Sequence, residues 1–329
     1  MLFSFTLMTG TLISISSSTW FMAWIGLEMN LLSLTPLMKT HKNKYSAEAT
    51  IKYFITQAMA SATLIFSIIL FLGLKNNLFE LATMTAPLIS LPLLMKMGCA
   101  PFHFWLPEVV SGISWNLNML ILTWQKIAPM IMMFYTIYSP LLLSMFIIIS
   151  SAIGSIGGLN QTCMRKLLVY SSINHIGWML SCLMNSLSTW LIYFIIYSLI
   201  NMNIILLLKN NKIYFFWQMN KISFNKSIKF LFMMNFLSLG GLPPFLGFFI
   251  KWMVINEMVI NNFIVLTLMM ILFTLIALFF YTRITFSTLT LSMMENMKIF
   301  YSKTNFMMSL ISFISLSSLI LSLSMNSLI

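Results

Sequence analysis

Long, nearly uncharged apolar runs make up most of this chain and limit the folds that it can adopt. Only 7% of its 329 residues are charged, 60% are hydrophobic, and the mean hydropathy is +0.94. A soluble domain carries about 25% charged residues, so this chain could not cover a globule of its size with polar surface. The net charge of +12 comes from 18 thinly spread Lys and Arg residues. These features exclude an ordinary soluble enzyme, a disordered chain and a nucleic-acid-binding domain.

The apolar runs predict an all-α polytopic membrane protein. A helix rises about 1.5 Å per residue, so a hydrocarbon layer of about 30 Å requires roughly 20 residues. Counting on this basis predicts eleven spans, near residues 2–19, 21–38, 49–73, 84–105, 115–137, 140–159, 166–185, 188–208, 229–256, 262–283 and 306–326.

The basic residues test this count, because Lys and Arg concentrate on the cytoplasm-like side of a membrane. With eleven crossings, the two termini lie on opposite sides. The N-terminal side then receives 14 of the 18 basic residues and the opposite side only Lys75, while three lie inside spans. We therefore expect the N-terminus on the cytoplasm-like side, which in a mitochondrion is the matrix.

Two predicted spans are interrupted in similar ways. Residues 91–107, LPLLMKMGCAPFHFWLP, carry Pro and Gly around Lys96, and residues 237–253, LSLGGLPPFLGFFIKWM, carry them ahead of Lys251. Proline removes a helical hydrogen bond, and in lipid the freed groups must be satisfied by protein or water. The interrupted spans, the fourth and the ninth, are five apart, so a five-span unit would repeat in inverted orientation. This pattern predicts two broken-helix halves, 1–138 and 139–285, in a single membrane domain that ends with a loop and helix at 286–329.

Ionisable residues inside the spans are candidates for function, because each costs several kcal/mol unless it is paired or hydrated. Desolvation favours a neutral lysine and an opposite charge favours the ammonium, so buried Glu and Lys side chains suit proton transfer. Histidine titrates near neutral pH without such help. The candidates for proton translocation are Glu28, Lys96, Lys126, Lys251 and His175, with His103 and Glu108 as weaker ones near the membrane edge.

A structural interpretation stands beside each of these assignments. Glu28 could form a structural ion pair with a lysine, and His175 could be a hydrogen-bonded packing residue. His103 and Glu108 could simply lie at the interface. The three cysteines are scattered, and neither a metal-ligand pattern nor a nucleotide-binding glycine motif is present. We therefore expect no metal and no cofactor in this chain.

Several strings carry a family resemblance that covers essentially the whole chain. They are WIGLEMN (24–30), SAEATIKYFITQAMAS (46–61), MKMGCAPFHFWLPEV (95–109), TWQKIAP (123–129), GGLNQTCMRKLLVYSSINHIGWM (157–179) and GGLPPFLGFFIKW (240–252). Together they resemble the antiporter-like membrane-arm subunits of respiratory complex I, NADH:ubiquinone oxidoreductase, which are related to Mrp-type cation/proton antiporters. The composition resembles insect members, with 31 Met, no Asp and two Arg, as expected for an AT-rich gene read with a mitochondrial code.

The resemblance implies a proton-translocating subunit in the mitochondrial inner membrane. Family members contain a Glu–Lys pair, a central Lys and a Lys on a broken helix, to which Glu28, Lys96, Lys126 and Lys251 correspond by identical residue types. NADH, flavin, iron–sulfur clusters and ubiquinone would belong to partner subunits, and the other partners would be membrane-arm subunits and phospholipids. Two alternatives stay open, a stand-alone cation/proton antiporter and a structural scaffold with inert lysines.

Overall fold

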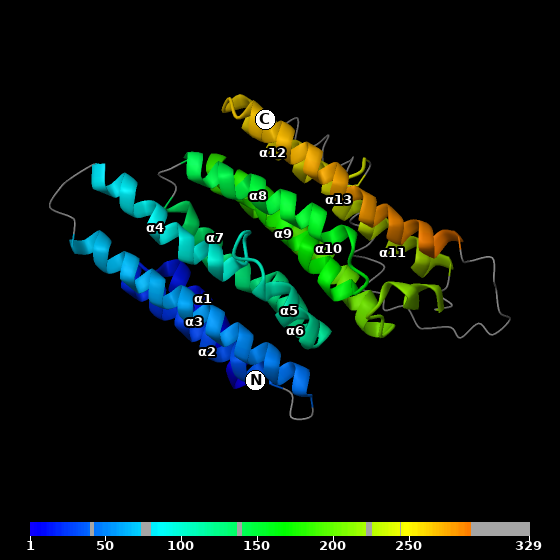
Figure 1. Cartoon of the computed structure of the whole chain (residues 1–329), viewed down its shortest axis with the longest axis horizontal. Coiled ribbons are helices and arrows are strands. Elements are labelled where there is room, and N and C mark those ends of the chain that lie inside the picture. The colour runs from blue at the N-terminus through cyan, green and yellow to red at the C-terminus, as the bar shows by residue number, and fades with distance from the viewer. Residues whose placement is uncertain (40–42, 74–79, 137–139, 222–225, 244, 291–329) are drawn as a thin grey trace. The chain divides into compact units, whose positions relative to one another are not determined.

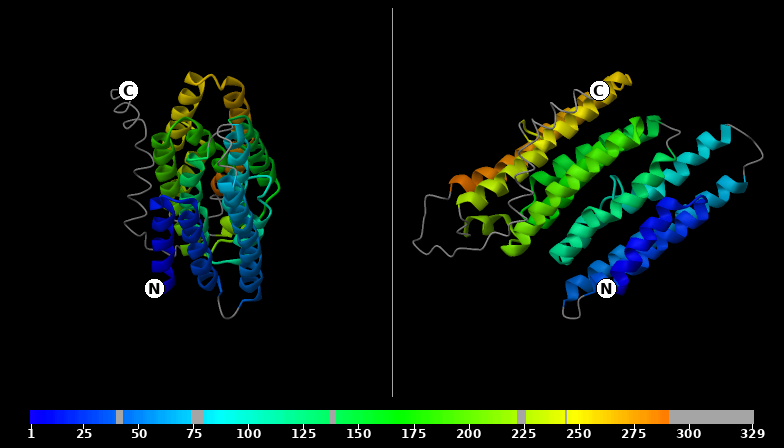
Figure 2. Two further views of the ribbon diagram at one scale, coloured as in Figure 1. Left: turned by 90° about the vertical axis from the view of Figure 1, so that its left-hand side faces the viewer. Right: turned by 180° about the vertical axis from the view of Figure 1, so that it is seen from behind.

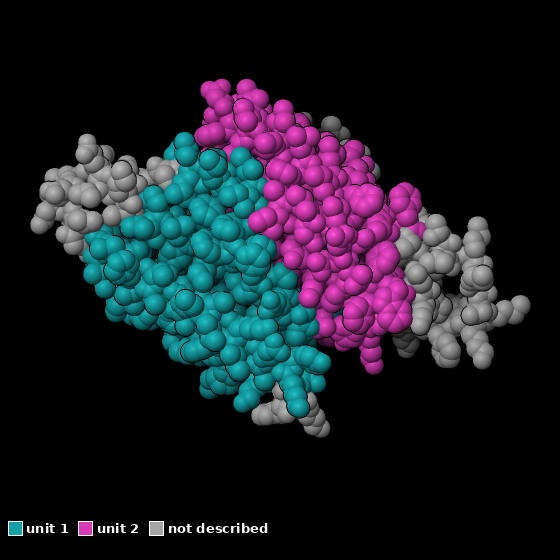
Figure 3. All heavy atoms as spheres, viewed as in Figure 1, with its two compact units in different colours: residues 1–150 teal, residues 151–329 magenta. Residues whose placement is uncertain are grey.

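The computed structural model describes residues 1–39, 43–73, 80–136, 140–221, 226–243 and 245–290. The chain divides into two compact units, Met1–Ser150 and Ser151–Ile329, which are coloured separately in Figure 3. The described residues form helices and no extended strand, and one isolated β-bridge pairs Cys163 with Phe215. The prediction of an all-α chain is confirmed for this part of the protein.

The first unit consists of long helices that pack side by side and three shorter helices that follow the end of the fourth helix at Met97. They are α1 Leu2–Ser16, α2 Trp20–Met38, α3 Lys44–Gly73, α4 Glu80–Met97, α5 Trp105–Gly112, α6 Trp115–Leu122 and α7 Trp124–Phe134, followed by α8 Pro140–Leu159 across the division between the units. Helix α2 packs between α1 and α3, and α4 contacts both α3 and α7 (Figure 1). These contacts place α3 beside both α2 and α4, and α4 beside both α3 and α7.

Glycines set the close approach of α1 and α2. A methyl group added at Gly26 would lie 2.6 Å from the backbone nitrogen of Ser14 and 2.8 Å from the carbonyl oxygen of Gly10. Small residues at helix crossings allow backbones to meet, which is the main means of helix packing in a membrane. The hydroxyl of Thr19 accepts a hydrogen bond from the Met22 amide at the start of α2, which is the usual role of an N-cap threonine.

The second unit packs its helices around α9, of which most residues are buried. The unit contains α9 Met164–Asn185, α10 Leu187–Asn210, the 3₁₀ helix η1 Phe216–Lys221, α11 Lys226–Gly240, α12 Leu246–Ile260 and α13 Ile264–Thr290. Helix α12 contacts α9, α10, α11 and α13, and the long helices of this unit run roughly along one direction (Figure 2). Residues on α12 therefore face four neighbouring helices.

Opposite ends of the second unit differ in charge. Arg165 lies at the start of α9, and Arg283 donates to the carbonyls of Leu159 (2.9 Å) and Gln161 (3.2 Å) at the end of α8. Glu257 accepts from Thr189 Oγ1 (3.0 Å) beside the other end of α9. Because α9 has 22 residues, these ends are about 33 Å apart. The separation fits a helix that crosses a membrane.

Seven helical segments of the described residues are long and apolar enough to cross a membrane. They are 20–38, 44–71, 115–134, 140–159, 164–185, 187–210 and 264–286. Shorter apolar helices, Leu2–Ser16, Pro87–Met97 and Leu231–Gly240, correspond to the expected first span and to the N-terminal parts of the two interrupted ones. The expected eleventh span, 306–326, lies outside the described residues.

Candidate functional site

The fourth predicted span is broken after Met97. Gly98 adopts φ +72°, its amide donates to the Met95 carbonyl (3.2 Å), and the Cys99 amide donates to Leu94 (3.0 Å). This is the Schellman arrangement, in which a glycine in the left-handed region ends a helix. Trp105 Nε1 donates across the break to the Met95 carbonyl (3.2 Å). The break is therefore a regular helix C-terminus, and the carbonyls of its last turn accept hydrogen bonds.

Lys96 lies in the last turn of α4 and is 7% exposed. Its carbonyl accepts from Gln57 Nε2 on α3 (3.3 Å), which fixes the backbone that carries it. The charge of Glu28, on α2, acts on Lys96 electrostatically. These two described side chains form no ion pair within 4 Å. Glu28 Oε1 is buried and has no hydrogen-bond partner among the described residues. The structure thus places Glu28 close enough to act on the charge of Lys96 without forming an ion pair with it.

Lys126 is the most buried of the lysine candidates, with 1% of its surface exposed. It lies in the first turn of α7, which follows an interruption at Thr123 in the fifth predicted span. The Thr123 hydroxyl donates to the Met119 carbonyl (2.6 Å) at the end of α6. Pro129 then lies inside α7. A third helix break therefore adjoins a buried lysine, although the sequence predicted one continuous span there.

Buried polar groups accompany Lys126 on the same pair of helices. Asn118 is fully buried, and both its amide nitrogen and its amide oxygen have no hydrogen-bond partner among the described residues. The same holds for Nε1 of Trp124 and Nε2 of Gln125. Buried polar atoms without protein partners are the groups that ordered water satisfies in proteins. This segment can therefore be hydrated.

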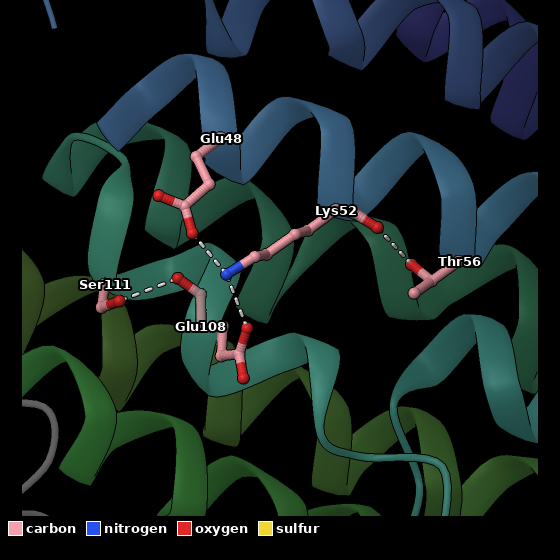
Figure 4. A network of polar contacts seen from close by, with 5 residues as sticks. All are labelled: Glu48, Lys52, Thr56, Glu108 and Ser111. Carbon is pink, nitrogen blue, oxygen red and sulfur yellow. Dashed lines mark hydrogen bonds and ion pairs between the residues drawn. The ribbon is translucent and has the colours of Figure 1, made fainter. Parts of the chain in front are cut away.

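His103 and Glu108 follow the break in α4 but have different environments. His103 is 5% exposed, and its Nδ1 lies 3.1 Å from the Pro101 carbonyl. The carboxylate of Glu108, on α5, lies 2.8 Å from Lys52 Nζ, which also contacts Glu48 at 2.6 Å (Figure 4). The two carboxylates of this ion-pair cluster are exposed, and Lys52 between them is half-buried. The cluster joins α3 to α5 and carries one net negative charge.

Comparison of two neutralised carboxylates can separate a structural from a functional role for Glu108. Glu48→Gln and Glu108→Gln each remove one of the two ion pairs of Lys52. Exposed ion pairs contribute little to stability, so both variants should assemble normally. If Glu108 gives protons access to the path, Glu108→Gln alone should lower the proton-pumping rate of the assembled complex, modestly. Equal rates in the two variants would assign Glu108 to the ion-pair cluster only.

The ninth predicted span is broken by the same backbone motif as the fourth. Gly241 adopts φ +80°, its amide donates to the Ser238 carbonyl (3.0 Å), and the Leu242 amide donates to Leu237 (3.3 Å). Helix α12 then returns close to the end of α11. A methyl group added at Gly247 would overlap the carbonyl oxygen of Ser238. Glycine at this position therefore permits the contact between the two half-helices.

Lys251 lies one turn after Gly247 and reaches back to the end of α11. Its Nζ donates to the carbonyls of Gly240 (2.8 Å) and Leu239 (3.3 Å). The side chain is 8% exposed, and Nζ lies 5.9 Å from the centre of the Trp178 ring. Lys251 forms no ion pair with any described carboxylate. Its partners are thus backbone carbonyls and an aromatic face.

His175 lies on α9, one turn before Trp178, and is 3% exposed. Its Nδ1 lies 2.8 Å from the hydroxyl of Tyr193 on α10. The Tyr197 ring lies 5.0 Å away, centre to centre. His175 is therefore held in a polar and aromatic environment, and Trp178 on the same helix contacts Lys251.

Sequence reasoning missed several residues that shape these sites. Gln57 and Tyr193 contact their partners 39 and 18 residues away along the chain, and no local spacing predicts such contacts. Thr189 donates to Glu257 across 68 residues. Of these shaping residues, only Trp178 could have been found from the sequence, because a residue three positions after His175 lies on the same face of the helix.

Comparison with known proteins places this arrangement in a family. A family model described as "NADH:quinone oxidoreductase/Mrp antiporter, TM" matches residues 17–280. NADH-ubiquinone oxidoreductase chain 2 of Anopheles gambiae is 46% identical over 317 residues, which cover 95% of this chain and 92% of that protein. The chain belongs to the NADH-ubiquinone oxidoreductase chain 2 family. The resemblance noted in the sequence is thereby confirmed.

Solved structures share the fold of this member of the chain 2 family. A chain of respiratory complex I from Thermus thermophilus superposes with a TM-score of 0.86 at 22% identity, covering 98% of this chain and 77% of that one. A chain of the Mrp complex from Dietzia sp. gives a TM-score of 0.75 at 16% identity, covering 91% of this chain and 60% of that one. At such identities the likeness concerns the fold.

Proposed function

We propose that this chain is a proton-translocating, antiporter-like subunit in the membrane arm of NADH:ubiquinone oxidoreductase, in the mitochondrial inner membrane. The observation that carries the proposal is the burial of three lysines, Lys96, Lys126 and Lys251, in apolar helices. Buried ammonium groups are expensive in a membrane and mark proton or ion pathways. Membership of the chain 2 family supplies the redox complex to which such a pathway would be coupled.

Electron transfer from NADH to ubiquinone belongs, in this proposal, to partner subunits. Flavin, iron–sulfur clusters and the quinone site are assigned to those partners, and this chain binds no cofactor. The energy of the redox reaction arrives as a change in charge or hydration near the buried residues. The work of this chain is to take protons from the matrix side and release them into the intermembrane space.

The proton path runs through the residues in a defined order. Glu28 controls the charge of Lys96, on which it acts electrostatically, Lys126 is the central relay, and Lys251 passes the proton onward. His175 takes part beside Trp178, while His103 and Glu108 give access near the break in α4. Buried side-chain amides without hydrogen-bond partners among the described residues, those of Asn118 in the first unit and Asn203 in the second, support hydration of this path.

The topology that accompanies this function has eleven spans in a single membrane domain. Two inverted five-helix repeats occupy 1–138 and 139–285, and a loop and final helix follow at 286–329. The shared Gly-terminated motif at Gly98 and Gly241 supports the correspondence of the two broken helices. Basic residues at one end of α9 and α10 support an N-terminus in the matrix, and the C-terminus then lies in the intermembrane space.

A stand-alone cation/proton antiporter is the alternative, because an Mrp chain shares the fold. We favour the redox-coupled subunit, since a bare cation site prefers carboxylates and this chain has only six acidic residues. A purely structural scaffold would confine the effect of lysine substitutions to assembly.

Native gel electrophoresis of gently solubilised membranes tests membership of the complex. An antibody to this chain should label the same very large band that stains for NADH dehydrogenase activity. Migration only as a small, NADH-inactive species would contradict the proposal. Sodium- or potassium-driven proton flux would then be the measurement that tests the stand-alone antiporter.

A further inference from the structure

The two helix breaks share one backbone motif but differ in what satisfies their terminal carbonyls. The last turn of a helix leaves carbonyls without intrahelical partners. At the end of α4, the carbonyls of Met95 and Lys96 accept from Trp105 Nε1 and Gln57 Nε2. These donors are an indole and an amide, and neither changes its protonation near neutral pH.

At the end of α11, an ionisable group fills the same role. Lys251 Nζ donates to the carbonyls of Leu239 and Gly240. A helix C-terminus carries roughly half a negative charge and attracts a cation, and a charged donor makes a stronger hydrogen bond than a neutral one. The end of α11 is therefore capped by the side chain that we propose as a proton carrier, and the end of α4 is not.

Gly241 makes this cap possible. A Cβ atom at this position would lie 2.9 Å from Lys251 Nζ and 2.8 Å from its Cδ. The backbone at Gly241 also has the positive φ that disfavours other residues. Glycine here serves both the helix terminus and the passage of the Lys251 side chain across it.

We infer that the carbonyls of Leu239 and Gly240 bind the Lys251 ammonium, and that the end of α11 is firmly capped only while Lys251 holds its proton. Gly241 is a positioning residue for this side chain. Loss of the proton leaves a neutral amine, which is a weaker donor to the two carbonyls. Passage of a proton through Lys251 thus loosens and restores the helix break. This inference deepens the proposed function and rests on the assignment of Lys251 as a proton carrier.

Other titratable groups lie on the helices packed against α12, and none forms an ion pair with Lys251 among the described residues. Glu257 lies on α12 itself, more than one turn from Lys251 and hydrogen-bonded to Thr189. The described side chains of α11, residues 231–240, include no titratable group. The neighbouring helices carry Arg165, Lys166, Tyr170, His175 and Cys182 on α9, Tyr193, Tyr197 and Lys209 on α10, and Tyr281 and Arg283 on α13. Lys251 is the titratable side chain that donates to the carbonyls of this break, so it is the group expected to make the break respond to pH.

Hydrogen exchange in the assembled complex, without NADH, tests the inference. The protection factors of the Gly241 and Leu242 amides, corrected for the intrinsic effect of pH, should fall about tenfold between about pH 6 and pH 9, because a charge-assisted hydrogen bond becomes a neutral one. Gly98 and Cys99 provide the internal control, since they form the same motif with neutral donors. Their corrected protection should stay constant.

Variants of Lys251 and Gly241 test whether the Lys251 cap, rather than another titrating group, causes the pH response of the exchange protection. Lys251→Met should give low protection at both pH values, and Lys251→Arg, which stays charged, should give high protection at both. Gly241→Ala should remove the pH response, whereas Gly98→Ala, with the same backbone strain in the other unit, should preserve it. A pH response that persists in Lys251→Met, or one that is equal at Cys99 and Leu242, would overturn the inference. If Lys251→Arg does not assemble, the wild-type and Lys251→Met measurements decide.

The outcome is distinguishable from failure of the proposed function. Exchange reports the cap in the resting complex, whereas proton pumping reports the pathway. Normal pumping in Lys251→Met, together with a pH-dependent cap in the wild type, would refute the relay role and keep the cap.

Discussion

Replacing Lys126 with alanine should nearly abolish proton translocation through this subunit in the assembled enzyme. Lys126 is 1% exposed, and no other described lysine lies on α6 or α7, so nothing on these helices can replace its proton-carrying group. Loss of a positioned proton-transfer group slows the transfer by about 100-fold or more. The measurement is the number of protons translocated per electron from NADH in sealed vesicles.

Two further variants test whether lost side-chain volume, or the removal of any lysine, would explain the same result. Lys126→Met removes the ionisable group but fills most of the side-chain volume, so it should assemble normally and still pump poorly. Lys209→Ala, at an exposed lysine at the end of α10, should pump as the wild type does. An unchanged ratio of protons to electrons in assembled Lys126→Met would show that Lys126 is not the central relay.

Gly247→Ala should prevent correct packing of the second unit. The added methyl group would overlap the Ser238 carbonyl oxygen, which is backbone and cannot turn away. Helix α12 would have to move away from α11, which would also withdraw Lys251 from its carbonyl partners. Overpacking of this kind costs about 3 kcal/mol or more when the neighbour is rigid. We expect little assembled complex on native gels and reduced thermal stability of what assembles.

Gly240→Ala is the matched control for that prediction. A methyl group there would lie 3.5 Å from the nearest atom, Cδ2 of Tyr281, which is an ordinary contact. Its φ is not positive, so alanine is not strained. Gly240→Ala should therefore assemble at wild-type levels. Equal assembly of the two variants would contradict the tight contact between α11 and α12.

The elements that could be predicted from sequence are those whose signal is local. Apolar runs of span length and Pro–Gly interruptions near Lys96 and Lys251 depend on neighbouring residues only. The described residues are helical over these runs, and both breaks lie at the Pro–Gly interruptions. The interruption at Thr123 was not predicted, because TWQKIAP contains no residue that breaks a helix before Pro129. Threonine hydroxyls compete with backbone donors only weakly, so the sequence carried no clear signal there.

The amino-acid composition alone shows that this chain belongs in a membrane, because too few charges are present to cover a soluble globule. The sequence also shows which ionisable residues lie inside apolar helices, and therefore which ones need a functional reason to be there. The sequence strings quoted above resembled the antiporter-like subunits of complex I, and the similar proteins of the chain 2 family confirmed that resemblance.

The partners of each buried polar group, in contrast, depend on how the helices pack against one another. Gln57 and Trp105 donate hydrogen bonds to the terminal carbonyls of α4, and Lys251 donates to those of α11. The Tyr193 hydroxyl lies within hydrogen-bond distance of His175. These contacts join residues on different helices or on opposite sides of a break. Helix packing depends on the volume and shape of whole faces, and neither periodicity nor composition encodes which donor reaches a given carbonyl. The protonation-dependent cap at α11 follows from that packing.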